Sequence, residues 1–292
     1  MTIWKNYYLA KDIPDALRLL SQAPGPARLV AGGTDLLLDL QQGRHPPVHT
    51  LVDITHLPEL TALEIRGDSL YVGAAVPLNQ VVASPLVRQH AQALYEAAGL
   101  IGGPQVRNTA TLGGNVGHAL PAGDGTISLL ALGALAEVAS QEGCRKVPMD
   151  SLFAGPGRST LDPRGELLAG FYLPLRGDGQ GSAFRRVMRP QGVAIAILNL
   201  AVWLQREAET IADVRLAVGP SGPVPYHAVG AEEALRGERM GEAAIGRAIE
   251  ALLSEARFRT SPHRSTAEYR REMSAFLLRE TLSTAWQRGV EC

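Results

Sequence analysis

The chain contains very little cysteine. Only Cys144 and Cys292 occur among its 292 residues, too few and too far apart for a disulfide framework or for the clustered thiolates that hold an iron–sulfur centre. The histidines form no HExxH or HxH pair, so their spacing does not favour a metal site. Any iron–sulfur cluster that works with this chain must therefore lie in another polypeptide.

An excess of charge of one sign and a long apolar run are also missing. The 28 basic and 29 acidic residues leave a net charge of −1, and the basic residues form no stripe that could neutralise nucleic-acid phosphates. No run approaches the roughly 18 apolar residues of a membrane-spanning helix, and the first residues lack the apolar region of an export signal. We therefore expect a cytoplasmic protein with no membrane span and no nucleic acid among its partners.

The composition is that of an ordinary globular protein. Hydrophobic residues make up 46% and charged residues 20% of the chain, and the length suggests two domains, the first of them subdivided. Glycine and charge interrupt the pattern of strands and helices at Pro174–Gly181. We place the domains at 1–176, with subdomains of about 1–57 and 58–176, and at 177–292.

Short strands alternate with helices along the chain, which predicts an α+β fold. Asp12 and Pro14 open a helix over Asp15–Leu20, Gly67-Asp68 forms the turn of a hairpin, and a glycine-rich loop is expected over Gly99–Gly125. The other expected strands are Ala27–Ala31, His49–Asp53, Ala62–Ile65, Ser69–Gly73, Ala136–Ser140, Leu167–Leu173, Ser182–Arg189, Val193–Gln205 and Val214–Gly219. The other expected helices are a segment from Leu36, then Leu86–Ala98, Ile127–Leu135, Glu232–Leu235, Met240–Glu255 and Ala267–Gln287.

Two segments each combine a glycine pair with hydroxyl and amide side chains. In the first, a strand ends in Gly32-Gly33 and leads into the helix from Leu36, with Thr34 or Asp35 at its start; in the second, Gly113-Gly114 follow a threonine-rich stretch. Glycine has no Cβ, so successive backbone N–H groups and the start of a helix can face a phosphate. Two such loops suit a pyrophosphate, although either one alone is more often a tight turn.

Neither loop matches the common nucleotide-binding motifs. GxGxxG and GxxxxGK[ST] are both absent from these loops, which disfavours a Rossmann dinucleotide site and a P-loop nucleoside triphosphatase. The ligand of the two loops therefore has to be inferred from the segments around them.

Four segments, in a fixed order, span almost the whole chain. They are AGGTDL at Ala31–Leu36, GGPQVRNTATLGGNV at Gly102–Val116, PAGDGTISLLALGA at Pro121–Ala134 and SPHRSTAEYRR at Ser261–Arg271. Together they resemble the FAD-binding medium subunits of the xanthine dehydrogenase and carbon monoxide dehydrogenase family, the molybdenum hydroxylases. The last segment resembles the signature of the family's C-terminal domain.

The resemblance implies a fold and an activity. The implied fold is a two-subdomain FAD-binding module of the vanillyl-alcohol oxidase (PCMH) type, followed by an α+β C-terminal domain. The implied activity is electron transfer: noncovalently bound FAD receives electrons from the 2Fe-2S clusters of a small subunit and passes them to an external acceptor. A molybdopterin-binding large subunit would oxidise the substrate, so this chain would carry no catalytic residue for that step and no metal.

Two other classes of function stay open. A free-standing flavin oxidase or reductase of the same fold would need its own substrate-binding domain with convergent acid and base residues, and the chain from Ser182 onward shows no such group. An interaction protein that has lost FAD would have no reason to keep both glycine loops and Asp124.

The resemblance also implies, position by position, which residues contact FAD. The first pyrophosphate loop comprises Leu29, Val30, Ala31, Gly32, Gly33, Thr34, Asp35 and Leu36, and the second comprises Thr111, Leu112, Gly113, Gly114 and Asn115. Asp124 matches an aspartate that contacts the adenosine part, and Ile101, Leu168 and Arg185 match positions around the isoalloxazine ring.

The single positions each have a plainer interpretation. Asp124 would equally cap a helix that begins near Thr126. Ile101 and Leu168 would equally be core residues, and Arg185 would equally be a solvated surface arginine.

Several neighbouring residues complete the expected site. Arg107 and Asn108 should brace the second loop rather than touch FAD. Leu120 stands where the family often has serine or aspartate, and Ile127 where it often has proline, which changes the contacts expected around the adenine.

One histidine and one cysteine stand near these segments. His118 follows the second loop and could lie near the cofactor, although neither proton donation nor covalent flavin attachment is favoured. Cys144 is expected in a turn beside two basic residues that would lower the pKa of its thiol. With no partner base nearby, it is interpreted as an incidental thiol.

Overall fold

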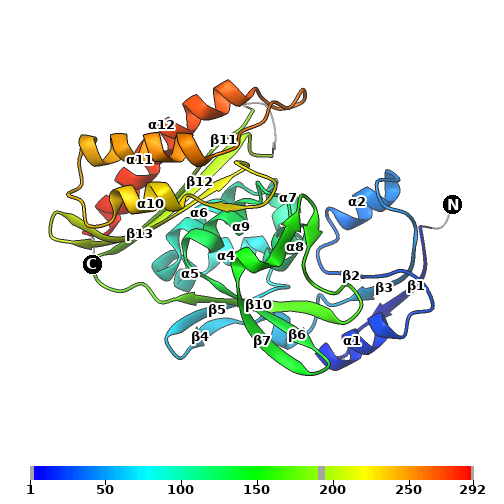
Figure 1. Cartoon of the computed structure of the whole chain (residues 1–292). Coiled ribbons are helices and arrows are strands. Elements are labelled where there is room, and N and C mark those ends of the chain that lie inside the picture. The colour runs from blue at the N-terminus through cyan, green and yellow to red at the C-terminus, as the bar shows by residue number, and fades with distance from the viewer. Residues whose placement is uncertain (1–2, 190–194, 291–292) are drawn as a thin grey trace.

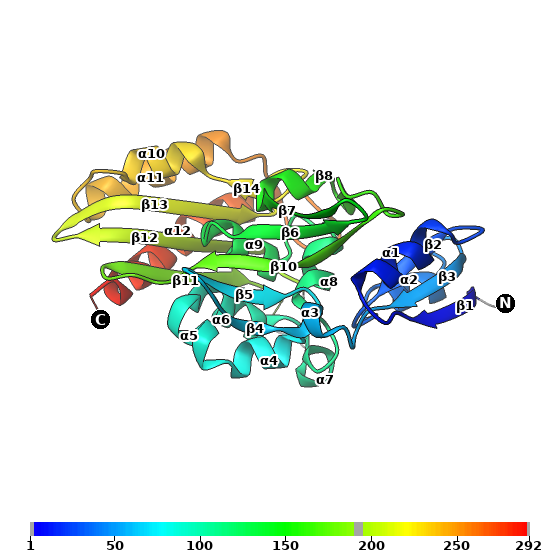
Figure 2. The same cartoon turned by 90° about the horizontal axis from the view of Figure 1, so that it is seen from below.

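The strands of the described residues form three main sheets (Figure 1). The computed structural model describes residues 3–189 and 195–290. Along the chain the sheets have three, five and four strands, and a further pair of short strands, β8 (Phe153–Gly155) and β9 (Arg158–Ser159), forms a ribbon. The three-stranded sheet stands at one end of the molecule (Figure 2).

The first sheet is parallel, so helices have to connect its strands. Its strands lie in the order β1 (Trp4–Leu9), β3 (Val48–Asp53) and β2 (Ala27–Val30). The connections are α1 (Ile13–Ser21) and α2 (Leu36–Gln41).

Helix α1 begins where the sequence predicts. The Asp12 carboxylate accepts a hydrogen bond from the Asp15 amide at 2.7 Å, and Pro14 fits the first turn because no N–H is needed there. The apolar face of the helix then packs inward, with Leu17 and Leu20 buried. The predicted helix is confirmed.

The second sheet is antiparallel, and its central strand is the long β10. In spatial order its strands are β4 (Leu63–Arg66), β5 (Ser69–Gly73), β10 (Glu166–Pro174), β6 (Leu135–Ser140) and β7 (Gly143–Pro148). The helices that accompany it are α3 (Pro58–Thr61), α4 (Leu78–Ala83), α5 (Pro85–His90), α6 (Gln92–Leu100), α7 (Pro104–Arg107), α8 (Leu112–Gly117), α9 (Asp124–Ala131) and the 3-10 turn η1 (Met149–Leu152). Gly67, with φ of +62°, makes the predicted turn between β4 and β5.

The third sheet is antiparallel and is covered on both faces. Its strands are β11 (Gln180–Val187), β12 (Leu198–Glu207), β13 (Thr210–Gly219) and β14 (Tyr226–His227), and its own helices are α10 (Val229–Leu235), α11 (Glu242–Glu255) and α12 (Ala267–Arg288). Helices α10 and α12 pack on one face of this sheet. Helices α6 and α9, which accompany the second sheet, pack on the other face (Figure 1). The central strand β12 is accordingly apolar in nearly every position over LNLAVWL, because both of its faces are buried.

The second and third sheets share one apolar core. Phe184, Ala201 and Ala217 of the third sheet belong to the same buried cluster as Leu94 on α6 and Ile127 on α9. The two regions therefore cannot separate without exposing this cluster to water.

The structure differs from the prediction in three places. The single helix expected over 86–98 is broken at Ala91, whose φ of −139° and ψ of 57° separate α5 from α6. The loop expected over 99–125 contains α7, α8 and the start of α9, because side-chain caps and tertiary contacts stabilise short helices of weak propensity. Cys144 lies in β7 opposite Ala139, not in a turn, since this exposed edge strand has no apolar alternation to reveal it.

Two further points concern the limits of the described chain. Residues 190–194, which include the beginning of the strand predicted over 193–205, lie outside the described residues. Among the helices of the described part, none is long and apolar enough to cross a membrane.

Candidate functional site

The first glycine loop contacts Thr109 and Ala110, which lead directly into the second loop. A Cβ atom added to Gly32 would lie 2.7 Å from the Thr109 carbonyl carbon and 2.8 Å from Ala110 Cα. Real Cβ atoms do not approach backbone so closely, so this contact requires glycine. The structure thus brings together the two segments that the sequence assigns to one pyrophosphate.

The first loop leaves a row of backbone amides unpaired. Leu29 and Val30 end β2, and α2 begins after Asp35, whose side chain makes no capping hydrogen bond. In the described chain, the amides from Gly32 to Leu36 donate to no protein acceptor; the first that does is Leu37, to the Gly33 carbonyl at 3.0 Å. Successive free amides are the donors that a phosphate group needs.

Gly33 gives this loop its shape. Its φ of +66° lies in the left-handed region, which residues with a Cβ rarely adopt. An added Cβ would also lie 2.9 Å from the Leu37 side chain. Both positions therefore require glycine, Gly32 because another backbone segment approaches closely and Gly33 because of its backbone conformation.

The second loop has already used most of its amides. The Thr111 hydroxyl caps α8 by accepting a hydrogen bond from the Gly114 amide at 3.0 Å. The Gly113 amide donates to the Ala74 carbonyl at 2.8 Å, and the Leu112 amide is likewise bonded to a neighbouring segment. An added Cβ on Gly113 would lie 2.5 Å from Ala74 Cβ. The main role of this glycine pair is therefore to allow close packing, and Gly114 is its exposed member.

Asn115 connects the second loop to α9. Its side-chain oxygen accepts a hydrogen bond from the Thr126 amide at 3.3 Å, near the start of that helix. The cap residue of α9 is Gly123, so the interpretation of Asp124 as the helix cap is wrong. The Asp124 side chain turns instead toward the third sheet.

Asp124 is the centre of a buried polar cluster between the two regions. It is 5% exposed, forms an ion pair with Arg186 on β11, and accepts a hydrogen bond from the Asn199 side chain on β12 at 2.6 Å. Burial raises the pKa of the Asp124 carboxyl, and the charge of Arg186 and the hydrogen bond from Asn199 oppose that rise. Sequence analysis missed both partners, because they lie 62 and 75 residues further along the chain and carry no local motif.

The cluster around Asp124 has unused hydrogen-bonding capacity. Three of the buried polar atoms in this cluster lack a partner among the described residues: Thr126 Oγ1, Arg186 Nε and Asn199 Oδ1. Unsatisfied buried polar atoms are costly, and a polar ligand is one way to satisfy them. A donor, an acceptor and a hydroxyl together fit the hydroxyl and amino groups of an adenosine.

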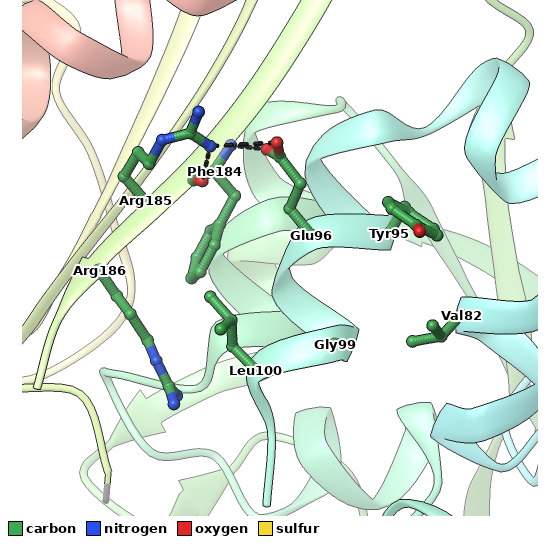
Figure 3. Close-up of a pocket in the computed structure, with 8 residues that line it drawn as sticks. All are labelled: Val82, Tyr95, Glu96, Gly99, Leu100, Phe184, Arg185 and Arg186. Atoms are coloured by element: carbon green, nitrogen blue, oxygen red, sulfur yellow. Dashed lines mark hydrogen bonds and ion pairs between the residues drawn. The ribbon is translucent and has the colours of Figure 1, made fainter. Parts of the chain in front are cut away.

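Arg185 lies beside a pocket of about 380 Å³ at the junction of α6 and β11 (Figure 3). Its Nη1 contacts Glu96 Oε1 at 3.0 Å, and its side chain is 39% exposed. Phe184 and Leu100 line the same pocket. The arginine is therefore neither free nor buried, and part of its charge is balanced by Glu96.

Glu96 is itself held by the C-terminal region. It accepts hydrogen bonds from the Phe184 amide at 2.8 Å and from Arg288 at 2.6 Å. Burial raises the pKa of the Glu96 carboxyl, but these hydrogen bonds and the charges of Arg288 and Arg185 outweigh it, so the pKa lies below its usual value.

The other two positions expected around the ring do not line this pocket. Leu168 is 9% exposed and belongs to the shared core, where it lies near Gly117. Ile101 ends α6 and packs against the same core.

Comparison with known proteins shows the family. Residues 3–176 match the family model described as the FAD binding domain in molybdopterin dehydrogenase. The chain belongs to that family. Residues 182–285 match the model described as the CO dehydrogenase flavoprotein C-terminal domain, so an FAD-binding domain is followed by a C-terminal domain, as the resemblance implied.

Relatives of the family match along almost their whole length. The nicotine 6-hydroxylase medium subunit of Paenarthrobacter nicotinovorans is 33% identical, with 97% of this chain and 98% of the relative covered. The xanthine dehydrogenase FAD-binding subunit of Escherichia coli O157:H7 is 30% identical, with 96% and 95% covered. A solved structure of carbon monoxide dehydrogenase from Hydrogenophaga pseudoflava, which lacks the Mo-pyranopterin moiety of its cofactor, matches with a TM-score of 0.92 at 29% identity, covering 97% of this chain and 98% of that chain.

Arg107 and Asn108, expected to brace the second loop, form side-chain hydrogen bonds with residues outside it, so that role stays a prediction. Arg107 donates hydrogen bonds to the Gly102 carbonyl at 2.6 Å and the Ile101 carbonyl at 3.2 Å. Asn108 accepts a hydrogen bond from Asn79 at 3.1 Å.

His118 is the C-cap residue of α8, and its amide donates to the Gly114 carbonyl at 3.0 Å. Its position near the cofactor stays a prediction, whereas the expectation for Cys144 is tested. The Cys144 thiol has a raised pKa, owing to burial and to the charge of Glu137, so the lowered pKa predicted from its basic neighbours is wrong.

Proposed function

We propose that this chain holds FAD noncovalently between its two glycine loops and acts as the electron-transfer subunit of a molybdenum hydroxylase complex. The observation that carries the proposal is the contact between Gly32 and Thr109, which sets the unpaired amides of the first loop beside the second loop. When bound, FAD supplies two-electron storage with one-electron exchange, which suits a relay between iron–sulfur clusters and an external acceptor.

The phosphate end of the cofactor would be held mainly by the first loop. Its unpaired amides from Gly32 to Leu36 would donate to the pyrophosphate oxygens. The segment from Thr111 to Asn115 would contribute a rigid wall and the exposed face of Gly114, because its own amides are largely bonded within the protein.

The adenosine end would lie near Asp124. The buried atoms without partners on Thr126, Arg186 and Asn199 support this assignment, since they offer polar contacts that the protein itself leaves unused. In this arrangement the ion pair of Asp124 with Arg186 holds both side chains in fixed positions.

The flavin ring would lie toward Ile101, Leu168 and Arg185. A guanidinium near the ring favours the reduced, anionic form of a flavin. Glu96 sets the position of Arg185 through their contact of 3.0 Å. The partners would be a molybdopterin-binding large subunit and a 2Fe-2S small subunit, because the relatives are named as medium chains, medium subunits or FAD-binding subunits of two dehydrogenases and a hydroxylase.

A free-standing flavin oxidase or reductase is the second candidate, and the names of the relatives disfavour it. The domain boundaries near residues 57 and 176 and the cytoplasmic location stay predictions.

The proposal is tested by an ultraviolet-visible spectrum of the purified chain before and after acid precipitation, followed by anaerobic titration. We expect a flavin that acid releases, that dithionite reduces, and that candidate substrates reduce only when both partner subunits are added. Direct reduction of the isolated chain by a substrate would favour the free-standing enzyme. A colourless chain that does not take up added FAD would contradict the proposal altogether.

A further inference from the structure

A buried arginine without a partner lies near the start of the last helix. Arg270 is 2% exposed, and its Nε is buried without a hydrogen bond. Within the described ranges its side chain has no ion pair or hydrogen bond to the protein. The other buried charged residues differ: Asp124 is paired with Arg186, and Glu232 accepts the Leu216 amide at 2.7 Å. A buried charge that lacks a partner is costly, so Arg270 requires an explanation.

Two further arginines surround Arg270 with more positive charge. The Thr260 hydroxyl accepts from the Ala267 amide at 3.1 Å, which brings the segment that carries Arg259 and Arg264 to the start of α12. Burial, and then the charges of Arg264 and Arg259, lower the pKa of Arg270. Neither Arg264 nor Arg259 has an ion pair within residues 3–189 and 195–290. Three mutually repelling cations without a carboxylate form a site that a doubly charged anion would stabilise.

The backbone places the cluster at the start of a long helix. Arg270 lies in the first turns of α12, a helix of 22 residues whose start attracts negative charge. The preceding segment is closed into a small loop, because Ser261 and Ser265 form a β-bridge and the Ser261 amide donates to the Ser265 carbonyl at 2.9 Å.

We propose that Arg259, Arg264 and Arg270 form a binding site for a phosphate group, separate from the glycine loops. A phosphate carries nearly two negative charges and several acceptor oxygens, so it matches three guanidinium groups better than one carboxylate does. The phosphate can come from free inorganic phosphate or from a mononucleotide, and the experiment distinguishes these sources.

The test uses the full, FAD-loaded chain and measures binding by calorimetric titration at constant ionic strength with sodium chloride as the balancing salt. Inorganic phosphate and adenosine monophosphate are the probes. We expect phosphate to bind the unaltered chain and the affinity to fall by about tenfold or more in Arg270→Gln, since a charge-assisted hydrogen bond is lost from a buried site. Arg264→Gln, at an exposed position, should weaken binding as well.

The matched control is Arg271→Gln. Arg271 is adjacent in sequence and exposed, but its guanidinium donates to the Leu253 carbonyl at 2.8 Å instead of facing the cluster. It should leave phosphate affinity unchanged. An equal loss in Arg271→Gln would mean a general effect of charge and would overturn the proposal.

The remaining outcomes also decide the matter. Tighter binding of adenosine monophosphate than of phosphate identifies a nucleotide as the source, and equal binding identifies free phosphate. If Arg270→Gln fails to fold, Arg264→Gln and Arg270→Lys decide, with binding expected to fall in the first and to persist in the second. Absence of phosphate binding to the unaltered chain would overturn the proposal, and weaker association of the Arg270→Gln chain with its partner subunits would then assign the cluster to a protein interface.

Flavin absorbance is recorded for every sample, so this test is independent of the FAD assignment. Loss of flavin in Arg270→Gln would show that the cluster belongs to the FAD site and would overturn a separate phosphate site. Retained flavin with lost phosphate binding is the expected result.

Discussion

The two glycine loops look alike in sequence but differ in what their backbone does. From Gly32 to Leu36 the amides have no protein acceptor, whereas Gly113 and Gly114 donate to the Ala74 carbonyl and the Thr111 hydroxyl. The amides of the first loop are thus available to a ligand, whereas those of the second loop are hydrogen-bonded within the fold. Equal motifs therefore do not imply equal roles, and a substitution in each loop should have a different main effect.

The polar groups near the second loop follow the same rule. Asn115 holds the start of α9, and Asp124 is bonded to Arg186 and Asn199. On this side of the candidate site, the polar side chains therefore serve mainly to stabilise the fold. The predictions below separate loss of stability from loss of flavin, beginning with the largest expected effect.

Asp124→Asn should destabilise the chain the most. Removing one partner leaves Arg186 as an uncompensated buried charge, which costs about 3–5 kcal/mol. The free energy of unfolding is measured by urea denaturation, with Asp68→Asn at a surface turn as the control. Unchanged stability together with lost flavin would mean that Asp124 serves the ligand rather than the fold.

Gly113→Ala should also act on stability. The new Cβ would meet Ala74 at 2.5 Å in a packed region, and overpacking of this kind costs about 1–3 kcal/mol. Thermal unfolding in the absence of FAD should show the loss. A variant as stable as the parent chain but empty of flavin would contradict the structural role of the second glycine pair.

Gly32→Ala should act on flavin. Its Cβ would displace the Thr109 backbone and distort the row of free amides, so FAD affinity should fall by about tenfold or more, equivalent to roughly 1.4 kcal/mol. The ratio of flavin absorbance to protein absorbance measures it. The control is Gly246→Ala in α11, where an added Cβ meets nothing within 4 Å. Full flavin content in Gly32→Ala would remove the first loop from the proposed site.

Thr111→Ala should lower stability by about 1 kcal/mol, because the cap of α8 is lost. Thr111→Ser keeps the hydroxyl and should restore most of it. If both variants lose flavin equally while remaining stable, the methyl group rather than the cap is the important feature.

Glu96→Gln should give the smallest effect, and one that depends on pH. The pKa of Glu96 is lowered in the fold, so its stabilising contribution is present above the unfolded pKa, about 4.3, and is lost as the pH falls through the folded pKa. The melting temperature of the variant should therefore lie below that of the parent at neutral pH and approach it in acid. A constant difference at all pH values would exclude ionisation of Glu96 as the cause.

Sequence predicted best the features that neighbouring residues determine. The cap at Asp12, the strand at 69–73 and the turn at Gly67 each follow from a few adjacent positions. The family, too, was apparent from short segments, and the comparisons confirm it.

Features that depend on distant partners could not be predicted. The acceptor of the Gly113 amide is the Ala74 carbonyl, and the partners of Asp124 lie on β11 and β12. These partners are distant in sequence, so no local pattern predicts the contacts. The edge strand around Cys144 is exposed at nearly every position, and its sequence contains no alternation that would distinguish it from a turn.

The shared core of the second and third sheets limits how this chain can be divided. Phe184, Ala201 and Ala217 lie in one cluster with the side chains of α6 and α9, although they fall in the part that matches a separate family model. A gene fragment ending at residue 176 would leave an apolar face open to water and should aggregate. Either part can therefore be replaced by that of a relative only if the two facing surfaces still fit each other.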